Sequence, residues 1–184
     1  MTVVAAFLGS SCSGKSAIMM RKMTGRFIYT SDPTVEDSYD LSVELDGEIT
    51  QLRVWDTSGV EESLAVVDYL AKQASVIVFV FSVLSKTTFN GLDVYIASRE
   101  ASNGNKAHIL VGNMADDEER REVTTEEAEE FARAHGMKYI ETSAKTNQNI
   151  DALFELIVRE FKDKVGSPPV DTEPDRGKGL CEVF

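Results

Sequence analysis

Short apolar runs alternate along the chain with longer stretches in which apolar residues recur every three or four positions. A short continuous run is typical of a strand covered on both faces, and the longer period is typical of a helix that packs on one face. Val76 to Phe81 and His108 to Val111 are such runs and predict buried parallel strands. The clearest helical period consists of Ile150, Leu153, Phe154, Ile157, Val158 and Phe161.

Between Asp37 and Asp56, apolar and polar residues alternate one by one, which predicts strands with one buried face. Asp46-Gly47 interrupts the alternation and is a strong signal for a tight turn between two antiparallel strands. Before this hairpin, Val3 to Leu8 predicts a first strand and Lys15 to Met23 a first helix.

A capping-box pattern, Thr124 with Glu127, predicts a helix that runs to about His135 and that Gly136 ends. Residues 138–142 predict the last strand. In chain order these elements indicate an α/β fold: a six-stranded, mostly parallel sheet with one antiparallel edge strand and helices on both faces.

A length of 184 residues fits one domain, which we assign to residues 1–165. Residues 166–184 begin GSPPVDTEPDRGKGL, lack any apolar period, and predict a flexible tail. The longest apolar run is too short to span a bilayer. The first residues lack a basic region and lead into a glycine-containing loop, so we expect a first strand, not a signal peptide, and a protein that stays inside the cell.

The formal charge is −12, which argues against binding of the domain to nucleic acid or to an anionic membrane. The two cysteines, Cys12 and Cys181, lie far apart in the chain and indicate neither a disulfide framework nor a zinc site. An acidic stretch at residues 116–130 could bind a partner, but a solvated surface is the simpler interpretation.

The segment GSSCSGKS, from Gly9 to Ser16, matches the pattern G-x-x-x-x-G-K-[ST] between the first predicted strand and helix. Glycines let successive N–H groups point at phosphate oxygens, and the helix N-terminus adds positive potential. Lys15 could then reach the outer phosphates, and Ser16 could bind Mg²⁺. A Gly-Ser turn could match by chance, but the flanking elements favour a phosphate-binding loop.

Four further motifs follow in order: DPTVEDSY at residues 32–39, WDTSG at 55–59, VGNMAD at 111–116 and ETSAK at 141–145. Together with the loop they resemble the nucleotide-binding motifs of the Ras superfamily of small GTPases, over about residues 3–165, and the segment around Thr34 is most similar to the Ras family. The resemblance implies a P-loop NTPase G domain that binds GTP, GDP and Mg²⁺.

The resemblance also implies a role for each matching residue. Ser16, Thr34 and Asp56 would hold Mg²⁺, and Lys15, Thr34 and Gly59 would contact the γ-phosphate during hydrolysis. The nucleotide-binding residues would be Gly9, Ser10, Ser11, Cys12, Ser13, Gly14, Lys15, Ser16, Ala17, Phe27, Thr34, Gly59, Asn113, Met114, Asp116, Ser143, Ala144 and Lys145.

For the base, the resemblance implies that Asp116 accepts hydrogen bonds from guanine N1 and N2 and that the Ala144 N–H donates to O6. Lys145 would lie along the base or the ribose. Phe27 would pack on the base edge, although a plain core aromatic fits the sequence equally well.

Val60 stands where hydrolysing members of the family carry a glutamine that orients the attacking water. An isopropyl group makes no hydrogen bond, so we expect slow intrinsic hydrolysis. Ser11 and Cys12 replace a Gly-Gly pair, and the Ser11 side chain would obstruct an arginine finger from an activating protein. A different group could still place the water, which is the alternative. Cys12 could be an activated thiol, but a small residue that fills the loop is the favoured interpretation.

Met114 replaces the lysine of the family motif N-K-x-D and brings neither a charge nor a donor to the phosphate loop. We therefore expect weaker nucleotide binding and faster exchange.

The last four residues, CEVF, match a prenylation box with Glu182 at an imperfect position, so we expect a lipid on Cys181, although a chance terminus is the alternative. Phe184 favours geranylgeranyl. No basic patch or nearby second cysteine supports the anchor, so membrane attachment should be reversible or aided by a partner.

These features predict a monomeric, mainly GTP-bound signalling switch on the cytoplasmic face of the plasma membrane or an endomembrane, with a cytosolic pool. Effectors would bind Asp32 to Tyr39 and the adjoining strand, and an exchange factor could load it. Two alternatives remain: a pseudo-GTPase interaction module that does not cycle, and a true GTPase with a substitute for the glutamine.

Overall fold

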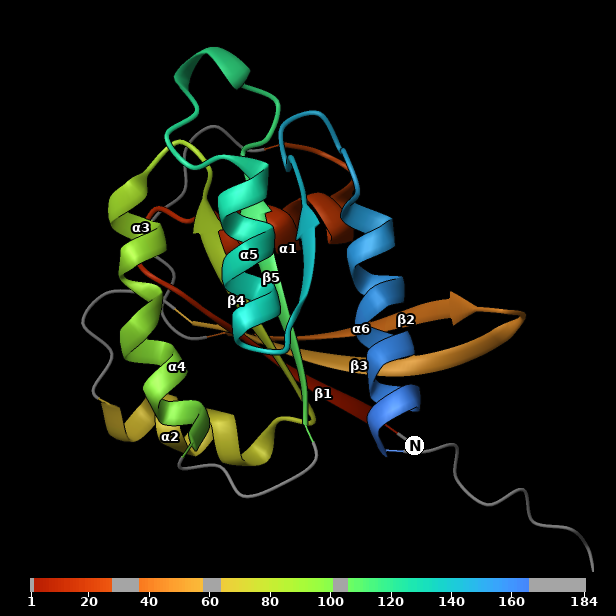
Figure 1. Ribbon diagram of the computed structural model, residues 1–184. Coiled ribbons are helices and arrows are strands. Elements are labelled where there is room, and N and C mark those ends of the chain that lie inside the picture. The colour runs from red at the N-terminus through yellow and green to blue at the C-terminus, as the bar shows by residue number, and fades with distance from the viewer. Residues whose placement is uncertain (1, 28–36, 58–63, 101–105, 166–184) are drawn as a thin grey trace, which may run out of the picture.

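The computed structural model describes residues 2–27, 37–57, 64–100 and 106–165. A six-stranded sheet crosses the molecule, with helices on both of its faces (Figure 1). The strands are β1 (Thr2–Leu8), β2 (Asp37–Leu45), β3 (Glu48–Asp56), β4 (Val76–Ser82), β5 (Ala107–Asn113) and β6 (Lys138–Glu141). The helices are α1 (Lys15–Thr24), α2 (Leu64–Gln73), α3 (Lys86–Asn90), α4 (Leu92–Glu100), α5 (Thr125–Ala134) and α6 (Ile150–Val165), with the 3₁₀ turn η1 (Glu118–Arg120).

The strand order is β2-β3-β1-β4-β5-β6, and among the described strands only β2 and β3 pair antiparallel. The predicted α/β class and the single antiparallel edge strand are therefore confirmed. Asp46 and Gly47 close the hairpin with φ angles of 54° and 82°, the left-handed conformation of a tight hairpin turn.

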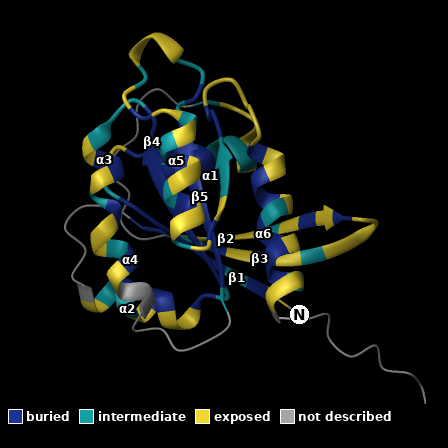
Figure 2. Ribbon diagram, in the orientation of Figure 1, coloured by how far each residue is buried: buried dark blue, intermediate teal, exposed yellow. Residues whose placement is uncertain are grey.

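Side chains of the inner strands alternate between two hydrophobic layers. In β4, Val78 and Val80 pack with α1 and α6, whereas Phe79 and Phe81 face the layer formed with α2, α3, α4 and α5. Figure 2 shows the inner strands β1, β4 and β5 buried between these helices, whose outer faces are exposed. Burial on both faces explains why the sequence of β4 is apolar without interruption.

Several element ends differ from the prediction by one residue. The α5 helix ends at Ala134, and β6 ends at Glu141, although the Thr142 N–H still donates to Gly112 O at 2.8 Å. The predicted capping box is formed only in part: Thr124 Oγ1 accepts from the Glu127 N–H at 3.2 Å, but the Glu127 carboxylate pairs with Lys86. Because the Glu127 carboxylate forms an ion pair with Lys86, it does not close the capping box.

Five of the strands run in the same direction, so their carboxyl ends meet at one edge of the sheet. The loops that follow β1, β5 and β6 carry Gly9, Met114 and Ser143, and β3 ends there with Asp56. Ligands of open α/β sheets bind at such an edge. The described helices include none that is long and apolar enough to span a bilayer.

Candidate functional site

The loop between β1 and α1 is shaped by two glycines that no other residue could replace without displacing neighbours. A Cβ on Gly9 would lie 2.1 Å from the Val80 carbonyl oxygen, and a Cβ on Gly14, where φ is +89°, would lie 2.2 Å from Asn113 Nδ2. The loop therefore lies too close to β4 and β5 for a side chain at either glycine. Helix α1 starts directly after Gly14, at Lys15.

Lys15 is only 4% exposed, and its Nζ donates to the carbonyl oxygens of Gly9 at 2.6 Å and Ser10 at 3.2 Å. The ammonium group is therefore held inside the curve of the loop. The α1 N-terminus, which has no acidic residue in its first turn, adds positive potential at the same place. A cation, a helix N-terminus and backbone N–H groups together form an arrangement that fits a phosphate group.

Two of the predicted Mg²⁺ ligands lie at this edge. Asp56 ends β3 opposite Phe7 of β1 and is 1% exposed, while Thr57 fixes the strand end by donating its hydroxyl to Phe7 O at 2.8 Å. Ser16 lies in the first turn of α1. Hydroxyl and carboxylate oxygens are the ligands that Mg²⁺ prefers, so these residues fit the ion.

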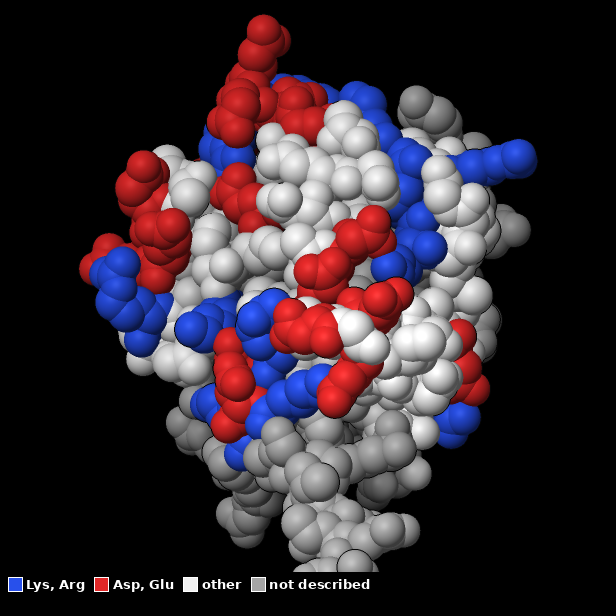
Figure 3. Space-filling view, turned by 90° about the vertical axis from the view of Figure 1, so that its right-hand side faces the viewer, with Lys and Arg blue, Asp and Glu red and all other residues white. Residues whose placement is uncertain are grey.

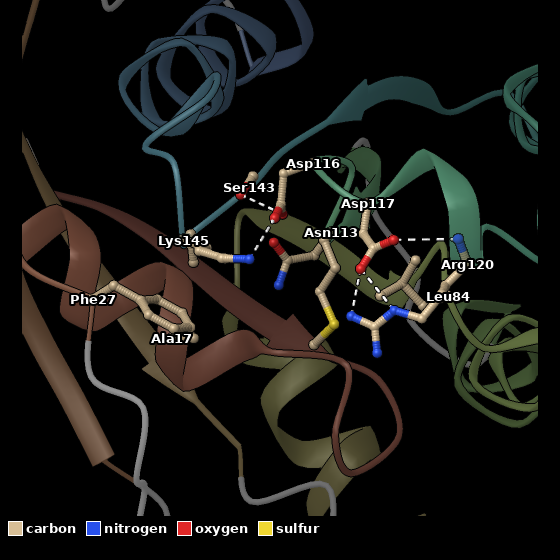
Figure 4. A pocket seen from close by; sticks show the side chains of 11 residues that line it. Ala17, Phe27, Leu84, Asn113, Asp116, Asp117, Arg120, Ser143 and Lys145 are labelled. Carbon is tan, nitrogen blue, oxygen red and sulfur yellow. Dashed lines mark hydrogen bonds and ion pairs between the residues drawn. The ribbon is translucent and has the colours of Figure 1, made fainter.

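A pocket of about 160 Å³ opens beside the loop (Figure 4). It is lined by Ala17, Phe27, Leu84, Asn113, Met114, Asp116, Asp117, Arg120, Ser143, Ala144 and Lys145. The structure thus brings together all of the described residues that the sequence assigned to the base.

Asp116 has a fixed orientation in this pocket. Its Oδ1 accepts the Ser143 hydroxyl at 2.7 Å, and its Oδ2 lies 3.5 Å from Lys145 Nζ (Figure 4). A carboxylate has about four lone-pair sites, so further N–H donors of a ligand can still bind it. The resemblance assigns these donors to the N1 and N2 groups of guanine.

Asn113 is buried and ties two loops together. Its Nδ2 donates to Ser13 O in the phosphate loop at 3.1 Å, and its Oδ1 accepts from Thr142 Oγ1 at 3.2 Å. The sequence assigned Asn113 to the nucleotide without this linking role. The partner of Asn113, Ser13, is itself fully buried.

Met114 occupies the left-handed region with φ of 65°, and its Sδ accepts the Ser82 hydroxyl at 3.2 Å. Its methyl group lies 3.5 Å from the position of a Cβ on Gly14, so Met114 reaches the phosphate loop through an apolar contact. Phe27 is half-buried: it lines the pocket and also packs against the hydrophobic core. Phe27 thus has a core contact, while its packing on a base stays a prediction.

Sequence reasoning missed Arg21, which holds the loop after β6. Its guanidinium donates to the carbonyl oxygens of Ala144 and Lys145, each at 2.5 Å, and to Gly25 O at 2.8 Å. An arginine of α1 thus holds the backbone of Ala144 and Lys145, two residues that line the pocket. No local pattern could have indicated this pairing, because the residues are 123 positions apart.

A second missed group surrounds Glu141, where β6 ends. Arg121 forms two hydrogen bonds of 2.9 Å with its carboxylate, and the hydroxyls of Tyr139 and Thr125 donate to it at 2.8 and 2.9 Å. Burial alone would raise the pKa of Glu141, but the hydrogen bonds from Arg121, Tyr139 and Thr125 outweigh it and lower the pKa. Burial and the bond to Glu141 raise the pKa of Tyr139.

Several predicted residues are exposed or undescribed. Ser11 and Cys12 are exposed on the phosphate loop, and Cys12 has a φ of 63°. Thr34, Gly59, Val60 and Cys181 lie outside the described residues, as does most of the segment from Asp32 to Tyr39.

Comparison with known proteins gives matches over the same region. The model of the Ras family matches residues 4–163. The Ras-related protein O-RAL of Diplobatis ommata is 36% identical over 160 residues, which cover 85% of this chain and 78% of that protein. The Ras-related protein Ral-B of Rattus norvegicus has the same identity and coverage.

Proposed function

Because the chain belongs to the Ras family, whose members are GTP-binding switches, we propose that it binds GTP and GDP with Mg²⁺ and signals through its triphosphate state. The observation that carries this proposal is the pairing of two subsites at one sheet edge. Lys15 lies in a phosphate-shaped loop, and Asp116 lies in the adjoining pocket with its carboxylate oriented by Ser143. Asp116 would select guanine, because adenine lacks the N1–H and N2–H donors that a carboxylate accepts.

Hydrolysis in this protein would be slow. Val60 cannot orient water, and Ser11 is exposed on the loop where an arginine finger would enter. The protein should therefore carry mainly GTP. Acid release of the bound nucleotide from purified protein, followed by chromatography, tests this: GTP is expected, and GDP would contradict it.

A second experiment isolates the role of Val60. Single-turnover hydrolysis should become faster in Val60→Gln, because an amide can orient the attacking water. Val60→Leu is the matched control and should stay slow. An unchanged or lower rate in Val60→Gln would remove this explanation and favour a true GTPase with a different water-positioning group.

Nucleotide exchange would be fast because Met114 supplies no cation to the guanine base or to the phosphate loop. Release of fluorescent GDP should be slower from Met114→Lys than from wild type in stopped flow. Equal release rates would contradict the proposal. A protein that is loaded without help would need an exchange factor less than other members of its family.

The proposed function includes a membrane and an effector. Prenylation of Cys181 would place the protein on the cytoplasmic face of a membrane, which mass spectrometry of protein from its native cells tests; an unmodified CEVF end would contradict it. Effectors would bind residues 32–39 and strand β2, whose position at the sheet edge supports strand addition. A pseudo-GTPase would instead bind the same effector equally well with GDP and with GTP.

A further inference from the structure

One wall of the base pocket is apolar. Met114 and Leu84 line it, and the Ser82 hydroxyl holds the Met114 sulfur at 3.2 Å. We refer to these two side chains as the Met114–Leu84 wall. It offers contact area to a nucleotide but no positive charge.

Arg120 brings a cation to the same pocket from the 3₁₀ turn η1. Asp117 holds it: Asp117 Oδ2 accepts from Arg120 Nε at 2.7 Å and also from Nη2, while Oδ1 accepts the Arg120 backbone N–H at 3.2 Å. Figure 4 shows this pair on one side of Asn113 and the pair of Asp116 with Lys145 on the other. The pocket is thus bordered by two acid–base pairs, neither of which the sequence indicated.

The pair of Arg120 and Asp117 contributes little to stability, because the Arg120 side chain is 74% exposed and water screens the charges. Among the described residues, Asp117 accepts two of the five N–H groups of the guanidinium, one on Nε and one on Nη2. Such a group stacks on aromatic rings and also donates to polar oxygens. The position of Arg120 in the pocket lining is therefore better explained by contact with a ligand than by a contribution to the stability of the fold.

We propose that Arg120 is a nucleotide-binding residue: its guanidinium, held by Asp117, stacks on the guanine ring beside the Met114–Leu84 wall and supplies the positive charge that Met114 does not. This inference rests on the proposed binding of GDP and GTP. Arg120 would then slow the release of nucleotide, which would be still faster without its guanidinium.

The first test is stopped-flow release of fluorescent GDP from the full chain. Arg120→Ala should release it about three- to tenfold faster than wild type, the range expected for loss of a cation–ring contact. Arg133→Ala is the matched control, because Arg133 is exposed on α5 and outside the pocket lining, and it should release GDP at the wild-type rate. Equal rates in wild type and Arg120→Ala would overturn the inference.

A second variant separates stacking from charge. Arg120→Lys keeps the charge but loses the planar group, so its release rate should lie between those of wild type and Arg120→Ala. A rate as fast as that of Arg120→Ala would contradict a contribution of the charge, and a rate as slow as that of wild type would contradict stacking. The melting temperature without nucleotide should be the same in all three proteins, and a large fall in Arg120→Ala would instead indicate a structural role.

A double-mutant cycle tests whether Arg120 supplies the positive charge that Met114 lacks. If Arg120 replaces a missing cation, Arg120→Ala should accelerate release less in a Met114→Lys background than in wild type, and strictly additive effects would contradict this. Different results would refute the proposed function and the role of Arg120. Wild type that does not bind GDP would refute the proposed function, whereas normal binding with no effect of Arg120→Ala would refute only the role of Arg120.

Discussion

At the scale of single residues, Asn113 links the phosphate loop to the loop that follows β6. In Asn113→Ala, the buried Ser13 carbonyl and the buried Thr142 hydroxyl would each lose the hydrogen bond that Asn113 forms with them. We expect a loss of about 1–3 kcal/mol in the free energy of unfolding. Urea denaturation measures this loss.

The same substitution should accelerate GDP release, because the phosphate loop loses its connection to β5. Asn90→Ala, at an exposed position on α3, is the control and should change neither quantity. Lower stability with an unchanged release rate would mean that Asn113 supports the fold without restraining the phosphate loop.

At the scale of elements, the Arg121–Glu141 pair joins the region after η1 to the end of β6. Arg121→Met would leave the Glu141 carboxylate without its cation, although the side chain is still 18% exposed and water reduces the penalty. We expect a loss on the order of 1–3 kcal/mol near pH 7. Arg159→Met, exposed on α6, should be nearly neutral.

This effect should depend on pH. The pKa of Glu141 is lowered in the folded protein from an ordinary value of 4.5, so its pairing stabilises the fold fully above about pH 4.5. The stabilisation is lost as the pH falls through the lower folded value. The difference between wild type and Arg121→Met should therefore shrink below pH 4.5, and a difference that stays constant down to pH 3 would contradict this account.

The strands and helices could be predicted because each depends on its own sequence. Continuous apolar residues in β4 and the helical period of α6 reflect faces that are buried wherever the element lies. The restraints of the site could not be predicted in this way. Arg21 reaches Ala144, and Asn113 reaches Ser13 at a distance of 100 residues, only because loops from separate strands meet at one sheet edge.

The motifs indicated individual residues, which the periodicity of apolar positions cannot do. Asp116 and Ser143 belong to two separate motifs, and the structure joins them at 2.7 Å. Arg120 belongs to neither motif and was missed, because an exposed arginine in an acidic stretch is indistinguishable from a solubilising charge in a sequence.

At the scale of the whole molecule, a bound nucleotide should stabilise the fold, because the site is assembled from loops that only the folded sheet brings together. GDP at about 100 times its dissociation constant adds about 2.7 kcal/mol. For a chain of this size the melting temperature should rise by about 5–10 °C. ADP at the same concentration should leave it unchanged, and an equal shift with ADP would contradict selection of guanine by Asp116.

The folded unit should not need residues 166–184. Helix α6 ends at Val165, and its last turns are held by Phe161, which is 5% exposed in the core, and by Lys162, which pairs with Glu48 of the β2–β3 hairpin at 2.7 Å. A chain cut after residue 165 should therefore melt at the temperature of the full chain and release GDP at the same rate. A lower melting temperature would show that the tail packs on the domain.

A second truncation, after residue 157, provides the contrast. It removes Val158 and Phe161 from the core and the Lys162–Glu48 pair from the sheet edge. Loss of two buried apolar side chains costs about 4–8 kcal/mol, which is comparable to the whole stability of a typical domain. This shorter chain should fail to fold, which would place the limit of the structural unit within the last two turns of α6.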